Sequence, residues 1–150
     1  MDIFRKLSWA DSTGDAIPLY HDGVYHIFSL TSPPGTTVYP ARLRTTWEHS
    51  VSRDLVHWEE VGTALYPGEG EEPDACGVWT GAAVYGEKKY HIFYTGYNYN
   101  VHFQQTICHA VSDDGIHFEK DPKNPIIIPN EEEYEVVDWR DPYVFYNEDD

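Results

Sequence analysis

The sequence predicts an all-β protein built from propeller blades, because it contains an internal repeat, strand-like alternation within each repeat and many aromatic residues. Aromatic residues account for 15% of the 150 positions, with 12 Tyr, 6 Phe and 5 Trp, and aromatic side chains favour strands. Ten prolines and eleven glycines interrupt the chain too often for long amphipathic helices. A repeat that holds four strands is typical of a propeller blade.

The repeat is visible in two pairs of segments that keep their order along the chain. Residues 25–28 read Tyr-His-Ile-Phe and return unchanged at 90–93, 65 residues later. Residues 51–59 read Val-Ser-Arg-Asp-Leu-Val-His-Trp-Glu and return as Val-Ser-Asp-Asp-Gly-Ile-His-Phe-Glu at 111–119, 60 residues later. The repeating unit is therefore about 60 to 65 residues long, which indicates a repeat architecture.

Each unit contains an opening strand, two alternating strands and a turn that leads into a fourth, outer strand. In the first unit these segments are 15–23, 24–28, 47–52 and 54–59, and in the second they are 80–87, 89–94, 106–112 and 114–119. A third opening at 141–149 repeats the carboxylate, the spacing and the acidic turn of the first. We therefore expect blade 1 at about 15–75, blade 2 at about 76–137 and the start of blade 3 at 138–150.

The charge excludes several classes of partner. The chain carries 26 acidic and 10 basic residues, for a net charge of −16, and such a surface repels nucleic acids and anionic membranes. A neutral sugar is unaffected by this charge. The acidic loops 68–74 and 130–135 lack the alternating ligand spacing of an EF-hand, so we expect solvated loops and no metal.

The cysteines and the chain start give no sign of a cofactor or of secretion. Cys76 and Cys108 form no Cys-x-x-Cys pair, so there is no zinc or redox signature. No apolar run follows the N-terminal basic pair, and none is long enough for a membrane span. We expect a soluble, cytoplasmic protein without a cofactor.

Two aspartates are the candidate catalytic residues. Inner strands of a propeller line its axis, so residues at equivalent positions of successive inner strands converge at one mouth. Asp15 and Asp141 hold such positions, and Thr80 holds the matching place in the blade between them. Two carboxylates that face one pocket are what glycoside hydrolysis requires. Each aspartate on its own could equally be a turn residue, but Arg140 can keep Asp141 ionised and hold it by a bidentate bond.

The histidines divide into repeated and unrepeated positions. Repetition in both units indicates a structural role for the pairs His26 and His91, His49 and His109, and His57 and His117. His21 and His102 are not repeated, and either could reach a ligand.

Four motifs, in order, resemble those of glycoside hydrolase family 32, which contains invertases, levanases and inulinases. Residues 47–59 with 64–67 resemble the family's second conserved stretch, and 77–84 is similar to its Phe-Ser-Gly-Ser segment. Residues 108–115 resemble its Ala-x-Ser-x-Asp-Gly stretch, and 139–142 its Arg-Asp-Pro motif. The resemblance covers nearly the whole chain.

The resemblance implies a five-bladed propeller, of which this chain holds about two and a half blades, and a retaining mechanism on fructosides. Asp15 matches the family's nucleophile, and Asp141 with Arg140 matches its transition-state stabiliser. Trp47 and Trp79 are expected to flank the sugar pocket, with Thr80 beside them as a further substrate-binding residue.

The family's general acid is a Glu in a Glu-Cys motif that follows Arg-Asp-Pro, and this sequence contains no Glu-Cys pair. We therefore expect the 150-residue chain alone to be inactive or nearly so. The remaining blades would come from a C-terminal continuation or from another chain.

Two alternative functions remain open from the sequence. An inverting arabinosidase or xylosidase of family 43 type would share the shape, but its carboxylates would lie about 6.5 to 9.5 Å apart rather than about 5 Å. A sugar-binding module without catalysis would bind an oligosaccharide and retain that binding after Asp15→Asn.

Overall fold

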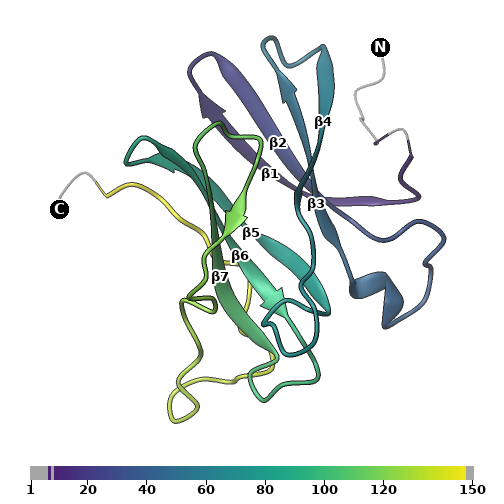
Figure 1. Cartoon of the computed structure of the whole chain (residues 1–150), viewed down its shortest axis with the longest axis vertical. Helices are drawn as coiled ribbons and strands as arrows, with labels where there is room; N and C mark the ends of the chain where they lie inside the picture. The colour runs from purple at the N-terminus through teal and green to yellow at the C-terminus, as the bar shows by residue number, and fades with distance from the viewer. Residues whose placement is uncertain (1–6, 8, 148–150) are drawn as a thin grey trace.

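The computed structural model describes Leu7 and residues 9–147, and it consists of two four-stranded antiparallel sheets (Figure 1). The first sheet contains β1 (Thr13–His21), β2 (Val24–Thr31), β3 (Thr46–Ser52) and β4 (Trp58–Leu65) in that order. The second contains β5 (Gly77–Gly86), β6 (Lys89–Tyr97), β7 (Gln105–Ser112) and β8 (Glu119–Lys120). In the described chain the one helical segment is the 3₁₀ turn η1 (Ala41–Leu43), and no helix has the length and apolar character needed to span a bilayer.

The inner hairpins turn in two residues in both sheets. His21 pairs with Val24 across Asp22 and Gly23, and these two residues have φ values of 47° and 76°. Gly86 pairs with Lys89, and the intervening residues 87 and 88 also have positive φ, at 50° and 66°. Two consecutive positive φ values are the geometry whose twist matches that of the flanking strands.

The repeated Ser-x-Asp-x-x-His sequence forms the same turn in both sheets. The Oδ1 atom of Asp54 accepts hydrogen bonds from the backbone N–H groups of Val56 and His57, and its Oδ2 lies 2.7 Å from His57 Nδ1. Asp114 makes the equivalent three contacts with residues 116 and 117. The hydrogen bonds from the imidazole and the backbone lower the pKa of both aspartates. The repeat therefore reflects a turn requirement, which is the structural role expected for His57 and His117.

The other four repeated histidines form one pair within each sheet, between adjacent strands. His26 Nδ1 is 3.0 Å from His49 Nε2, and His91 Nδ1 is 3.0 Å from His109 Nε2. The ring of His49 also stacks on Phe28 at 4.2 Å.

The core joins the two sheets. Phe28 and Trp47 from the first sheet and Tyr94 and Ile92 from the second are fully buried in one cluster. The Trp47 ring meets Tyr94 edge-on at 6.5 Å, and the inner strands β1 and β5 contact each other (Figure 1). The two sheets are thus adjacent blades that pack against each other through one common core.

The segment expected to open a third blade forms no strand. Residues 141–147 have no ladder partner in the described chain, and Tyr143, Phe145 and Tyr146 are 71–82% exposed. A strand requires a neighbour to accept and donate its backbone hydrogen bonds, so the sequence pattern alone does not produce one here.

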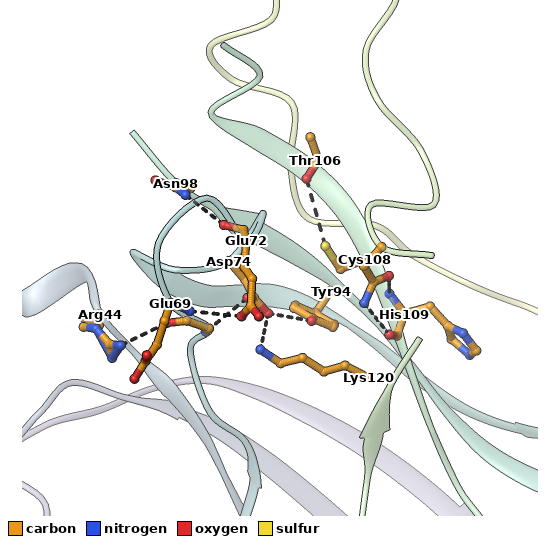
Figure 2. A network of polar contacts seen from close by, with 12 residues as sticks. Arg44, Glu69, Glu72, Asp74, Tyr94, Asn98, Thr106, Cys108, His109 and Lys120 are labelled. Carbon is orange, nitrogen blue, oxygen red and sulfur yellow. Dashed lines mark hydrogen bonds and ion pairs between the residues drawn. The ribbon is translucent and has the colours of Figure 1, made fainter. Parts of the chain in front are cut away.

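The acidic connector between the blades was expected to be a solvated loop, but the structure buries one of its carboxylates. Asp74 is 1% exposed, and its Oδ2 accepts from the Tyr94 hydroxyl at 2.7 Å and lies 2.6 Å from Lys120 Nζ (Figure 2). Its Oδ1 accepts from Gly68 N at 3.1 Å. A buried carboxylate is tolerated because each oxygen has a partner, and these partners attach the connector to the second blade.

Candidate active site

A cavity of about 360 Å³ lies where the first residues of β1, the first residues of β5 and the segment that ends at Asp141 meet. Five of the six candidate site residues line it: Asp15, Trp79, Thr80, Arg140 and Asp141. The cavity is further enclosed by the segment around η1, which contributes Arg42, Leu43 and Thr45.

Asp15 and Thr80 occupy the same irregularity in the two inner strands. The β1–β2 register shifts between Gly14 and Ala16, and the β5–β6 register shifts between Trp79 and Gly81. In each strand the skipped residue is unpaired, as in a β-bulge, which re-aims a side chain. The Thr80 hydroxyl donates a hydrogen bond to Asp15 Oδ2.

The bulge in β5 depends on the glycine that follows Thr80. A Cβ atom at Gly81 would lie 1.9 Å from the carbonyl oxygen of Phe93. Real Cβ atoms do not approach a backbone atom so closely, so β5 can form this bulge only with glycine at position 81.

Asp141 is attached to the same place through Thr95 on β6. Its backbone N–H donates to Thr95 Oγ1 at 2.8 Å, and that hydroxyl donates to the carbonyl of Thr80 at 3.1 Å. Thr95 is fully buried. Asp141 has φ 62° and Asp15 has φ 20°, and aspartate is among the few residues other than glycine that tolerate the left-handed region.

Arg140 and Asp15 act on Asp141 in opposite directions. Partial burial raises the pKa of Asp141, the guanidinium of Arg140 lowers it, and the negative charge of Asp15 raises it. Arg140 Nε lies 3.7 Å from Asp141 Oδ2, and its Nη1 contacts Asp138 and donates to Gln105 Oε1 at 3.2 Å. The two candidate carboxylates line the same cavity, and Asp15 lies close enough to Asp141 to raise its pKa.

Trp79 and Trp47 have different positions, and only Trp79 lines the cavity. The Trp79 indole donates to the carbonyl of Leu43 at 3.0 Å and stacks on Tyr97 at 4.0 Å. Trp47 is 0% exposed and donates to the carbonyl of Trp79 at 3.0 Å. Trp47, which the resemblance placed beside the sugar, therefore supports the cavity wall from the core and cannot contact a ligand directly.

The unrepeated histidines lie elsewhere. His21 stacks on Tyr85 at 3.4 Å at the hairpin end of β1, and His102 Nε2 is 2.8 Å from Glu131 Oε1. Neither lines the cavity that contains Asp15. Within the described ranges, no three His, Cys, Asp or Glu side chains are grouped so that they could hold a metal ion.

Sequence reasoning missed Arg42 and Thr95. Arg42 stands in a segment between strands whose course the sequence does not specify. Thr95 could have been noticed from the repeat, because the equivalent position of the first unit, two residues after Tyr-His-Ile-Phe, is the apolar Leu30.

Comparison with known proteins shows the family of the chain. The model of the glycosyl hydrolases family 32 N-terminal domain matches residues 15–150. The chain is 32% identical over 136 residues to sucrose-6-phosphate hydrolase of Zymomonas mobilis, and the match covers 87% of this chain and 25% of that protein. It is 46% identical over 67 residues to fructan 6-exohydrolase of Triticum aestivum, which covers 45% of this chain and 10% of that protein.

Solved structures show the same fold. Sucrose-6-phosphate hydrolase from Lactobacillus gasseri superposes with a TM-score of 0.73 at 28% identity, over 91% of this chain and 27% of that one. Fructan 1-exohydrolase IIa from Cichorium intybus gives a TM-score of 0.70 at 28% identity, over 86% and 24%. These enzymes are five-bladed propellers, and the present chain spans about a quarter of their length, in the N-terminal part. The prediction of an all-β, partial propeller is confirmed.

Proposed function

Because the chain belongs to glycosyl hydrolase family 32, we propose that it forms the nucleophile-bearing part of a retaining β-fructosidase. The observation that carries this proposal is the convergence of Asp15 and Asp141 on one cavity, with Asp15 on a strand bulge and Asp141 anchored through Thr95. Two carboxylates in one concave site match the requirement of glycoside hydrolysis.

Asp15 acts as the nucleophile in this proposal. Its carboxylate attacks the anomeric carbon, the bond from that carbon to the leaving oxygen breaks, and the leaving oxygen takes a proton from an acid outside residues 1–150. Water then attacks the same carbon and gives a proton to the conjugate base of that acid, and the bond to Asp15 breaks, which releases the sugar with retained configuration and regenerates the carboxylate. The Thr80 hydroxyl, which donates to Asp15 Oδ2, holds the other carboxylate oxygen in place.

Asp141 binds sugar hydroxyls and strengthens those bonds as positive charge develops on the ring. Burial and Asp15 both favour its neutral form, and Arg140 opposes them by charge. Arg140 therefore keeps Asp141 able to accept hydrogen bonds from the substrate. Trp79, which lines the same cavity, offers an apolar face to the ring.

The substrate class follows from the named relatives. They include sucrose-6-phosphate hydrolases and fructan exohydrolases, so we propose a terminal β-fructosyl unit as the group transferred to water. General acid catalysis contributes roughly 10² to 10⁴-fold, so the 150-residue chain without a further acid should be slower by that order or inactive.

Replacement of Asp15 tests the proposal. In the natural polypeptide that carries this chain, Asp15→Asn should lower kcat for sucrose by roughly 10⁴-fold or more, because the nucleophile is lost. Asp22→Asn is a matched control, since Asp22 is an exposed aspartate in the hairpin at the other end of the same strand. Its activity should stay within about twofold of wild type.

The first-formed anomer, followed by NMR, separates the alternatives. Retention of configuration supports the proposed mechanism, and inversion would instead indicate chemistry of family 43 type. Sugar binding that persists in wild type and in Asp15→Asn without any turnover would indicate a binding module.

A further inference from the structure

A second cavity, of about 510 Å³, lies next to the first and contains none of the candidate catalytic residues. Its walls come from the segment around η1, the connector between the blades and the loop after β6. The side chains that give it its chemistry are Arg44, Glu69, Tyr99 and Asn100.

The buried amide of Asn98 fixes the walls of the second cavity. Its Nδ2 donates to the carbonyls of Gly70 at 3.1 Å and Glu72 at 2.8 Å. Its Oδ1 accepts from Asn100 N at 3.0 Å and from Cys76 Sγ at 3.3 Å. Asn98 is 0% exposed, so its full set of hydrogen bonds holds the connector and the loop in one arrangement.

Further contacts hold the N-terminal part of the connector, around Gly68 (Figure 2). The Arg44 guanidinium donates to the carbonyl of Gly68 at 3.0 Å, and the backbone N–H of Gly68 donates to the buried Asp74. A site whose walls are already ordered loses little entropy when a ligand binds. The second cavity is therefore preorganised although it consists largely of loops.

The lining suits a neutral polar ligand with a flat apolar face. Tyr99 is 46% exposed and presents a ring, and Asn100, Arg44 and Glu69 supply donors and acceptors. Its lining contains one cationic and one anionic side chain, so the charged side chains of the lining balance. A carbohydrate residue has this combination of hydroxyls and an apolar ring face.

The segment around η1 borders both cavities. Arg42 and Leu43 face the first cavity, and Ala41 and Arg44 face the second. These four residues are consecutive, and one 3₁₀ turn rises only about 6 Å, so the parts of the lining that they form lie close together. Aromatic rings also connect the two, because Trp79 of the first cavity stacks on Tyr97, which contacts Tyr99 at a ring distance of 6.0 Å.

We propose that the second cavity binds further sugar residues of an oligosaccharide whose terminal unit lies in the first cavity, with Tyr99 as the stacking face. This rests on the proposed function, because it assigns the first cavity to the reacting sugar. Sugar binding in the second cavity would make the protein selective for oligosaccharides over disaccharides.

The test compares sucrose with 1-kestose and a five-unit fructo-oligosaccharide on the natural polypeptide. Wild type should show a kcat/KM that rises with chain length. Tyr99→Ala should lower kcat/KM for the five-unit substrate by about tenfold, since one aromatic contact is lost, and should change that for sucrose by less than about twofold.

Tyr20→Ala is the matched control, because Tyr20 is similarly exposed, at 59%, but lies near the hairpin end of β1. It should leave every substrate unaffected. Equal loss on all substrates, or no loss with Tyr99→Ala, would overturn the second cavity as a sugar site.

Calorimetric binding of the five-unit substrate separates this inference from the proposed function. If no substrate is hydrolysed, the fructosidase proposal fails, yet weaker binding by Tyr99→Ala than by Tyr20→Ala still supports the second cavity. Equal binding by both variants would reject it.

Discussion

A single unpaired residue in each inner strand forms the candidate site. Asp15 and Thr80 both stand where the strand register slips by one residue, and their side chains meet in a hydrogen bond. The internal repeat predicted that these positions correspond, but a bulge depends on which residues pair across strands. Sequence alone therefore indicated which positions correspond in the two strands, but not the geometry that brings Asp15 and Thr80 together.

Thr95 gives the sharpest test at this scale, because it links Asp141 to Thr80 through one buried hydroxyl. Thr95→Val keeps the shape and removes the hydrogen bonds. We expect kcat/KM for sucrose to fall by about tenfold or more, because about tenfold is expected for the lost hydrogen bond to Asp141 alone and the bond to Thr80 is lost with it. The pH profile should also move, because the surroundings that set the Asp141 pKa change.

Thr95→Ser should restore activity, since serine retains the hydroxyl. Thr106→Val is the control, as Thr106 is also buried, and within the described part of the chain its hydroxyl contacts only Cys108, at 4.0 Å. If Thr95→Val loses stability but keeps the wild-type pH profile and kcat/KM, Thr95 has no positioning role.

Trp47 shows the limit of prediction for single residues. The motif indicated an aromatic residue close to the sugar, and the residue is in fact in the core behind Trp79. Residues 47–50 of β3 are all buried, on both faces of the strand. With both faces covered, alternation along the sequence cannot tell which side chains point toward a cavity.

At the level of strands, the sequence predicted most of the architecture because hairpin turns and strand alternation are local. The Asp-Gly turn after β1 and the Ser-x-Asp-x-x-His turns are determined by nearby residues. The connector 66–76 is not, because the burial of Asp74 depends on Tyr94 and Lys120, which come much later in the chain. Its acidic composition predicted a solvated loop, and that prediction was wrong for Asp74.

The histidine pair on β2 and β3 makes the first sheet sensitive to acid. Burial, and to a lesser degree His26, lowers the pKa of His49 from 6.5 to about 3, and burial also lowers that of His26. The unfolded chain therefore binds protons below about pH 6.5 that the folded sheet excludes. Stability is fully present above pH 6.5 and is lost as the pH falls toward 3, by up to about 1.4 kcal/mol per pH unit for each such histidine.

Urea denaturation at pH 7.5 and pH 5.5 measures this dependence. His49→Phe, which keeps a ring against Phe28, should reduce the difference between the two pH values. Leu65→Ala, which weakens the packing of the same sheet without removing a titratable group, should leave the difference unchanged. The same pH dependence in wild type and His49→Phe would show that the buried imidazole is not its source.

For the molecule as a whole, the two blades share one hydrophobic core. Trp47 packs on Tyr94, Phe28 meets Phe118 edge-on at 5.7 Å, and Thr45 and Val78 exchange two hydrogen bonds across the boundary. In each of these contacts the two partners belong to different repeats, so no local pattern could predict them. The cavity of Asp15 exists only while both blades are folded against each other.

This coupling predicts that the blades open as one unit. Trp47→Ala in the first blade should cost about 3 to 5 kcal/mol, as for other buried large-to-small changes. Cys108 reports on the second blade, because it is 0% exposed and burial raises its thiol pKa to about 12, so that it reacts only after opening. Its alkylation rate, followed by mass spectrometry, should rise by roughly 10² to 4 × 10³-fold in Trp47→Ala. Trp9→Ala, which removes a ring that is 45% exposed, should leave the rate nearly unchanged. An unchanged Cys108 rate in a destabilised Trp47→Ala protein would mean that the second blade stays folded on its own.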